Sequence, residues 1–154
     1  MRRIAVIGLG NPDRGDDAIG ILVVRTLRER ISPDVTILED GSPVDVLQHW
    51  EKFDAVILVD AVCSGSPAGT IQVFDGLHLP SHVRPGTVSS HGFCVQDVIR
   101  LGDALGTLPG IVQVVGIEAA RFNPGEKPGP EVNAAIEEAV EAVLEQIRRI
   151  GSGE

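Results

Sequence analysis

The segment IAVIGLGNPDRGDDAIG, residues 4–20, constrains the fold more than any other part of the chain. It opens with an apolar run, Ile4 to Ile7, that has no polar face and is typical of a strand covered on both sides in a parallel sheet. Gly8 and Gly10 end this run. Apolar residues then recur at helical spacing from Ala18 to Leu27, so the segment predicts a strand, a loop and a helix.

Two carboxylates, Asp16 and Asp17, fall at the start of this helix, where acidic side chains suit the free backbone N–H groups. The same position is the carboxyl end of the first strand, and open α/β sheets bind their ligands at such ends. One interpretation is that both residues only cap the helix. The other is that at least one of them contacts a ligand, which two adjacent acids after a glycine-rich strand exit favour.

A dinucleotide-binding loop is the obvious alternative for this segment. Gly8 and Gly10 match the first two glycines of the G-x-G-x-x-G pattern, but Asp13 stands at the third position. Asp13, Asp16 and Asp17 would also place negative charge against a pyrophosphate. No phosphate-binding GK[ST] sequence occurs in the chain, so we expect no nucleotide cofactor.

The composition indicates one domain with an aliphatic core. The chain has 154 residues, of which 43% are apolar and none is Tyr. We expect a single α/β domain over residues 1–150 and a flexible tail at 151–154. A formal net charge of -9 argues against a nucleic-acid partner. No run approaches the roughly 18 apolar residues of a membrane span, and the N-terminal run is too short for a signal peptide. We therefore expect a cytoplasmic protein without membrane contact, and a monomer.

Strands and helices alternate along the rest of the chain, which predicts a doubly wound, mostly parallel sheet of about five strands with helices on both faces. Ser42 is expected to cap a short helix, and Val95, Val98, Ile99 and Leu101 are expected to face the core from a later one. The other predicted strands are 35–38, 54–60, 70–74 and 111–117. The predicted helices are one from Ala18 to near Arg30, one that begins at Pro43, one after His91 and one from Pro130 to about Arg149.

In such a sheet the carboxyl ends of the first and third strands are neighbours, so Asp17 and Asp60 should converge. Asp60 ends an otherwise apolar strand, where it is either a turn-forming residue or a ligand. His91 precedes a helix and could close over the pair. Two carboxylates and one imidazole suit a divalent metal of borderline hardness that keeps coordination positions open for water or substrate. His78 and His82 lie in the irregular segment 75–90, and we expect them to be solvated.

Several motifs together resemble one family, the endopeptidases that mature the large subunit of nickel-iron hydrogenases. The resemblance spans nearly the whole chain, in order and at similar spacing. The motifs are Gly8-x-Gly10-Asn11, Asp16-Asp17-Ala18-Ile19-Gly20, Leu58-Val59-Asp60-Ala61, Ser90-His91 and Gly116-Ile117-Glu118.

The resemblance implies that Asp17, Asp60 and His91 are the catalytic, metal-contacting positions. It also implies the reaction, removal of a C-terminal extension from the hydrogenase large-subunit precursor, with nickel carried by the substrate. The first position is commonly Glu in this family; Asp17 is one methylene shorter, so Asp16 could share its role. Two routes stay open: the metal polarises the carbonyl and activates water, or a carboxylate acts as general base.

Two other functions remain alternatives at this point. The sequence from Gly8 to Pro12 also resembles the opening of peptidyl-tRNA hydrolases, but the His-Asn expected after it is missing and the acidic chain suits tRNA poorly. A non-catalytic nickel-binding chaperone or sensor could use the same three residues, Asp17, Asp60 and His91. Only a protease would shorten a hydrogenase precursor.

Overall fold

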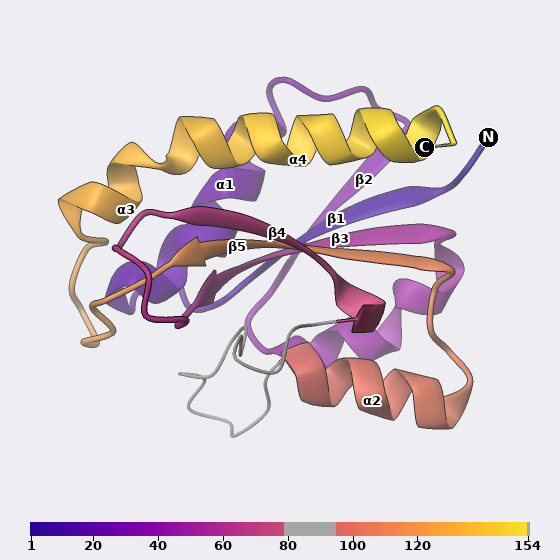
Figure 1. Ribbon diagram of the computed structural model, residues 1–154, viewed down its shortest axis with the longest axis horizontal. Coiled ribbons are helices and arrows are strands. Elements are labelled where there is room, and N and C mark those ends of the chain that lie inside the picture. The colour runs from indigo at the N-terminus through magenta and orange to yellow at the C-terminus, as the bar shows by residue number, and fades with distance from the viewer. Residues whose placement is uncertain (79–94, 154) are drawn as a thin grey trace.

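The fold is built on one five-stranded sheet, seen in a computed structural model that describes residues 1–78 and 95–153 (Figure 1). The strand order is β2-β1-β3-β5-β4. β1 pairs in parallel with β2 and β3, β3 pairs in parallel with β5, and β4 alone runs antiparallel, at an edge. This confirms the predicted doubly wound, mostly parallel α/β sheet. The strands are β1 (Ile4–Leu9), β2 (Val35–Asp40), β3 (Ala55–Val62), β4 (Ile71–Asp75) and β5 (Ile111–Glu118).

Helices cover both faces of the sheet. Figure 1 shows α1, α3 and α4 on one face, while α2 lies on the other. Short 3-10 helices complete the second face and connect the ends of strands. None of the helices in the described part of the chain combines the length and the apolar character that a membrane crossing requires. The helices are α1 (Ile19–Leu27), α2 (Val95–Leu105), α3 (Pro130–Ala134) and α4 (Ile136–Gly151), with 3-10 helices η1 (Gly15–Ala18), η2 (Pro43–Gln48), η3 (Trp50–Lys52) and η4 (Gly76–His78).

The first strand shows why its sequence is apolar throughout. Ile4 and Val6 pack into the core cluster on the α1 and α4 side, whereas Ala5, Ile7 and Leu9 pack into the cluster on the α2 side. Successive side chains of a strand point to opposite faces, so a central strand between two helical layers needs apolar residues at every position.

β2 and β3 extend further than the sequence predicted. β3 continues past Asp60 to Val62, because Asp60 to Val62 pair with Gly116 to Glu118 of β5. β2 likewise continues past Leu38 to Asp40, which pairs with Leu9. The prediction that Asp60 is the last residue of its strand is therefore wrong, because Asp60 lies inside the hydrogen-bond ladder between β3 and β5.

Two helix predictions were wrong in detail. Leu101 does not face the core: it is exposed, because Val95, Val98, Ile99 and Gly102 form the inner face of α2, and Gly102 packs against the Trp50 ring. The predicted helix 130–149 is two helices, separated at Ala135.

Two further positions differ from expectation. Ser42 makes no capping hydrogen bond with its side chain; its backbone carbonyl instead accepts from Asp45 N. At the other end of the chain, α4 includes Gly151, which places the helix end one residue inside the predicted tail 151–154, and Ser152 N donates to Arg148 O.

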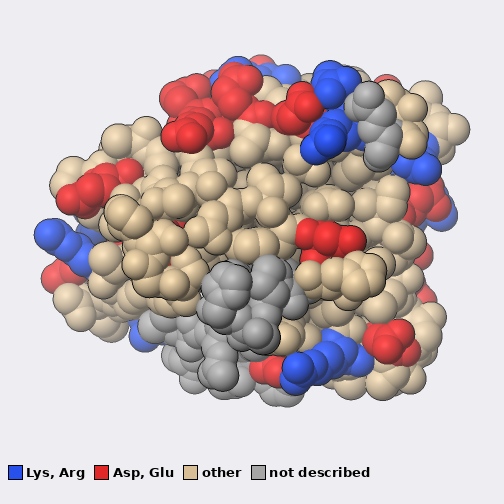
Figure 2. Space-filling view, viewed as in Figure 1, with Lys and Arg blue, Asp and Glu red and all other residues tan. Residues whose placement is uncertain are grey.

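The charged face of α4 follows the helix dipole. Glu137 and Glu138 lie in its first turn and Arg148 and Arg149 in its last, an arrangement that complements the partial charges of the helix ends. Figure 2 shows acidic side chains gathered over one end of this helix and basic ones over the other. Arg30, in the turn that follows α1, pairs with Glu137 of α4.

Candidate functional site

The start of α1 lies directly on the carboxyl ends of β1 and β3, and this contact brings Asp17 near Asp60. The contact depends on Gly20, because a Cβ at this position would overlap the carbonyl oxygens of Leu9 and Val59. The two carboxylates are close enough for the negative charge of Asp17 to raise the pKa of Asp60. The convergence predicted from strand order is therefore present.

Asp60 is a buried carboxylate with one unused oxygen. Its side chain is almost completely excluded from solvent, and Oδ1 accepts a hydrogen bond of 2.8 Å from Ala61 N. Oδ2 is buried without a partner among the described residues. Burial, with the charge of Asp17 as a second cause, raises the pKa of Asp60 well above its ordinary value. Such an oxygen costs free energy in an empty protein, and its presence beside a second carboxylate indicates a ligand site.

Asp17 is half-buried and stands at the edge of the same site. Its Oδ2 accepts a hydrogen bond of 3.0 Å from Asn11 N. Gly10 makes this bond possible: its φ of 121° lies in the region that favours glycine, and a Cβ there would overlap the carbonyl oxygen of Asp17. Burial raises the pKa of Asp17, while the Asn11 hydrogen bond and the charge of Arg14 act in the opposite direction.

Asp16, the neighbour of Asp17, has a different environment. It is buried, and both of its oxygens are used. Oδ2 accepts from Ala120 N at 2.8 Å and Arg121 N at 2.9 Å, and Oδ1 accepts from Gly129 N at 2.7 Å. Asp16 therefore fixes the loop of residues 119–129 against η1. Its two oxygens are committed to that loop, whereas Asp17 Oδ2 accepts a hydrogen bond from Asn11 N.

Glu118, at the end of β5, is a second carboxylate that holds a loop. It is buried and accepts hydrogen bonds from Ser64 N at 2.8 Å, Ser64 Oγ at 2.7 Å and Gly65 N at 3.0 Å. The sequence marked Glu118 only as the end of a strand and as part of a family motif. Four acidic side chains thus gather at this edge, and two of them, Asp16 and Glu118, are saturated by backbone and hydroxyl donors.

The predicted histidines divide into one that is described and two that are not. His78 is exposed in η4, and its Nδ1 lies 3.0 Å from Asp75 Oδ2, which agrees with the expected solvated residue. His82 and His91 lie outside the described residues. Within residues 1–78 and 95–153, no group of three or more His, Cys, Asp and Glu side chains is arranged to hold a metal ion. The described part supplies the two carboxylates of the predicted set, and the role of His91 stays a prediction.

Sequence reasoning missed a buried pair at the end of β2. Asp40 Oδ2 lies 3.0 Å from His49 Nε2, and both side chains are largely buried. Burial raises the pKa of Asp40, and His49 partly opposes this effect. The available signal was an acid at the end of a half-buried strand, nine residues before a histidine that lies between two short 3-10 helices.

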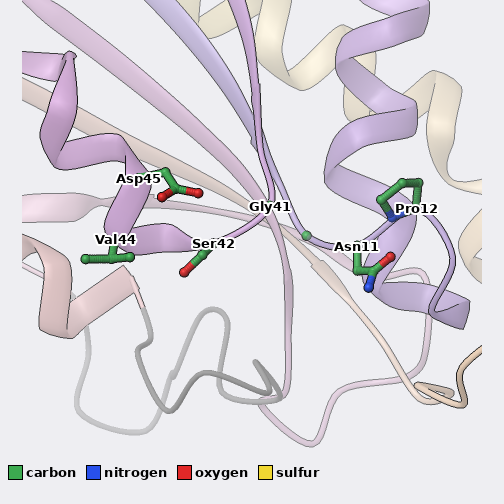
Figure 3. Close-up of a pocket in the computed structure, with 7 residues that line it drawn as sticks. Asn11, Pro12, Gly41, Ser42, Val44 and Asp45 are labelled. Carbon is green, nitrogen blue, oxygen red and sulfur yellow. The ribbon is translucent and has the colours of Figure 1, made fainter.

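An open pocket of about 700 Å³ lies at the carboxyl ends of β1 and β2 (Figure 3). The loop that carries Asn11 and Pro12 forms one wall, and the segment from Gly41 to Asp45 forms the other. Because Asn11 N also donates to Asp17, the pocket and the carboxylate pair share this loop.

The doubly wound sheet, with two carboxylates at its carboxyl edge, defines an α/β protein whose candidate ligand site lies at the strand ends. A family model described as hydrogenase maturation protease matches residues 21–146. The chain is 33% identical over 153 residues to the Hydrogenase 2 maturation protease of Escherichia coli, covering 97% of this chain and 93% of that protein. The chain belongs to the hydrogenase maturation protease family and is a peptidase.

Solved structures agree with this assignment. The hydrogenase maturating endopeptidase HybD from Escherichia coli is 28% identical, with a TM-score of 0.79 over 97% of this chain and 94% of that chain. The [NiFe] hydrogenase maturation protease HycI from Thermococcus kodakarensis KOD1 is 30% identical, with a TM-score of 0.72 over 93% and 90%. The family predicted from the motifs is confirmed, in preference to a peptidyl-tRNA hydrolase or a non-catalytic nickel-binding protein.

Proposed function

We propose that the protein removes the C-terminal extension of a [NiFe] hydrogenase large-subunit precursor and recognises the nickel that this substrate carries. The observation that supports the proposal most directly is the buried Oδ2 of Asp60, which has no partner among the described residues, beside the half-buried carboxylate of Asp17. Membership of the family supports the reaction class, and the two carboxylates are donors that could contact the nickel of the substrate.

The chemistry of the donors fits a divalent metal on the substrate. Carboxylate oxygens from Asp17 and Asp60, with the imidazole of His91 as the predicted third donor, suit a borderline metal that keeps positions for substrate groups. Burial and the charge of Asp17 raise the pKa of Asp60, and a bound cation would favour the ionised form of this carboxyl group. A precursor without nickel offers no such cation and should be a poor substrate.

The two carboxylates also have the properties of a general base. A carboxyl group whose pKa is raised by burial holds a proton more firmly than an ordinary Asp, so it can accept one from water during the attack on the peptide bond. Asp17 is the more accessible of the two, and its Oδ2 is oriented by Asn11 N. The loop 119–129, fixed by Asp16, borders the same edge and is the described part of the surface that we expect to help select the large subunit.

Incubation with purified, nickel-loaded precursor tests this function. We expect wild-type protein to shorten the precursor, measured by intact-mass spectrometry, and nickel-free precursor to stay intact. Asp17→Asn, Asp60→Asn and His91→Ala should each abolish cleavage, since each removes a donor from the proposed site. His78→Ala and His82→Ala should cleave at wild-type rates, as should Asp34→Asn, which changes an exposed acid before β2. Wild-type cleavage by two of the three site variants would contradict the assignment.

A further inference from the structure

Glu118, the last residue of β5, joins three segments of the chain at the carboxyl edge of the sheet. Its backbone N–H donates to Thr70 O, and its carbonyl oxygen accepts from Gly69 N, each at 2.8 Å. Its buried side chain accepts through Oε1 from Ser64 N and Gly65 N, and through Oε2 from Ser64 Oγ. Glu118 therefore holds both the entry to β4 and the segment that follows β3.

The segment that follows β3 begins close to Asp60. β3 stays paired with β5 for two residues beyond Asp60, and Val62 is the residue opposite Glu118 in this pairing. Ala119 N donates to Val62 O at 3.0 Å, which extends the contact by one more bond. Ser64 comes two residues after Val62, so the hydrogen bonds from residues 64 and 65 to the Glu118 carboxylate secure the last part of β3.

Val62 packs on the same face of the sheet as Asp60. The two side chains share this face because they are two residues apart in one strand. Asp60 pairs with Gly116 of β5, and a Cβ at Gly116 would overlap the Val62 side chain, so Val62 fills the space beside the residue opposite Asp60. Val62 is itself buried. It therefore helps to exclude water from the Asp60 carboxyl group, which strengthens the electrostatic interactions of that group.

We propose that Glu118 is a positioning residue for the reaction at Asp60: its hydrogen bonds keep β3 paired beyond Asp60 and keep Val62 packed beside the carboxyl group. Glu118 acts through β3 and does not need to touch the substrate. This inference rests on the proposed function for the reaction that Asp60 serves.

The role depends on the geometry of the Glu118 side chain and not on its charge. One oxygen, Oε1, accepts from both backbone N–H groups, so the carbonyl oxygen of a Gln can replace it. The other, Oε2, accepts from Ser64 Oγ, and the amide group of a Gln can donate to that hydroxyl oxygen instead. Glu118→Gln should therefore preserve the arrangement that Glu118→Ala removes.

Cleavage of nickel-loaded precursor compares these two variants. We expect Glu118→Ala to lower kcat/KM by about 10–100-fold, the range in which a small displacement of a reacting group reduces catalysis. Glu118→Gln should keep kcat/KM near the wild-type value. Leu27→Ala is the matched control for lost stability, because Leu27 is fully buried at the end of α1 farthest from Asp17. It should lose stability in urea and keep its kcat/KM at temperatures where it is folded.

Amide hydrogen exchange measures the positioning without any cleavage. Ala61 N donates to Asp60 Oδ1 at 2.8 Å and makes no contact with the Glu118 side chain, so its exchange reports on the Asp60 carboxyl group. Loss of a purely local loop anchor would accelerate exchange at Ser64 and Gly65 only. We expect exchange at Ala61 to accelerate as well in Glu118→Ala, and to stay at the wild-type rate in Glu118→Gln.

The contrary results are specific to each part of the proposal. Wild-type kcat/KM in Glu118→Ala, or unchanged exchange at its Ala61, would overturn the positioning role. Equal losses in Glu118→Gln and Glu118→Ala would show that charge matters instead, and an equal loss in Leu27→Ala would assign the effect to stability. If Glu118→Ala does not fold, Val62→Ala replaces it: this variant should also lower kcat/KM, and an unchanged value would contradict the proposal.

The same measurements separate this inference from the proposed function. If the wild type does not shorten the precursor, the proposed function fails, and exchange at Ala61 still decides whether Glu118 positions Asp60. If the wild type cleaves and Glu118→Ala cleaves equally well, the proposed function holds and the positioning role is wrong.

Discussion

Adjacent residues of the same type, Asp16 and Asp17, should respond in opposite ways to substitution by Ala. Asp16→Ala removes a buried carboxylate that accepts three backbone hydrogen bonds, and so releases the loop 119–129. Asp17→Ala removes a half-buried carboxylate that accepts one hydrogen bond, from Asn11 N, and whose pKa is raised chiefly by burial. The first change should reduce stability, and the second should remove activity with little effect on stability.

The magnitude for Asp16→Ala follows from the three donors. A hydrogen bond to a charged group contributes about 1.5–3 kcal/mol when its loss leaves a buried partner unsatisfied. The Gly129 N–H is buried and should count in full, whereas Ala120 and Arg121 are at the surface and their N–H groups can bind water. We expect the free energy of unfolding to fall by about 3 kcal/mol, which lowers Tm by roughly 6–12 °C in a domain of this size. For Asp17→Ala we expect a change within about 1 kcal/mol.

Urea denaturation measures both effects, with the fluorescence of Trp50, the single and fully buried Trp, as the probe. Amide hydrogen exchange adds local information, because Gly129 N–H should exchange faster in Asp16→Ala only. The reasoning would be refuted if Asp17→Ala lost as much stability as Asp16→Ala, or if Asp16→Ala lost less than about 0.5 kcal/mol.

Three further outcomes are expected. Burial and the charge of Asp17 raise the pKa of Asp60, so the folded state binds a proton more tightly than the unfolded chain does. The free energy of unfolding should therefore fall as pH rises from the ordinary pKa of Asp through the raised pKa of Asp60. Urea titrations should show that Asp60→Asn lacks this pH dependence and is more stable than the wild type at neutral pH. Gly20→Ala should lower the free energy of unfolding by about 2–3 kcal/mol, because the added Cβ would overlap backbone carbonyl oxygens of β1 and β3. Calorimetry measures this change, and an unchanged free energy of unfolding would contradict the close contact. The isolated protein should keep its Tm in excess EDTA, since its stability comes from an apolar sheet core; unfolding on chelation would instead indicate a structural metal.

Much of the fold followed from local patterns. The apolar run from Ile4 to Ile7 predicted a strand covered on both faces, and the alternation of strands and helices predicted the parallel sheet, because each pattern reports directly on how many faces of an element are buried. Boundaries were less accurate. β3 continues to Val62 because β5 offers partners there, and no signal within β3 itself records the length of its neighbour.

Chain order alone also placed Asp17 and Asp60 together, since the first and third strands of this topology are adjacent. Only the tertiary structure separates the environments of Asp16 and Asp17. The two side chains are identical, but Asp16 accepts hydrogen bonds from residues more than a hundred positions away, whereas Asp17 lies close enough to Asp60 to raise its pKa. That the buried Oδ2 of Asp60 lacks a partner within residues 1–78 and 95–153 is likewise visible only in three dimensions, because whether a polar atom is satisfied depends on the groups that folding brings around it.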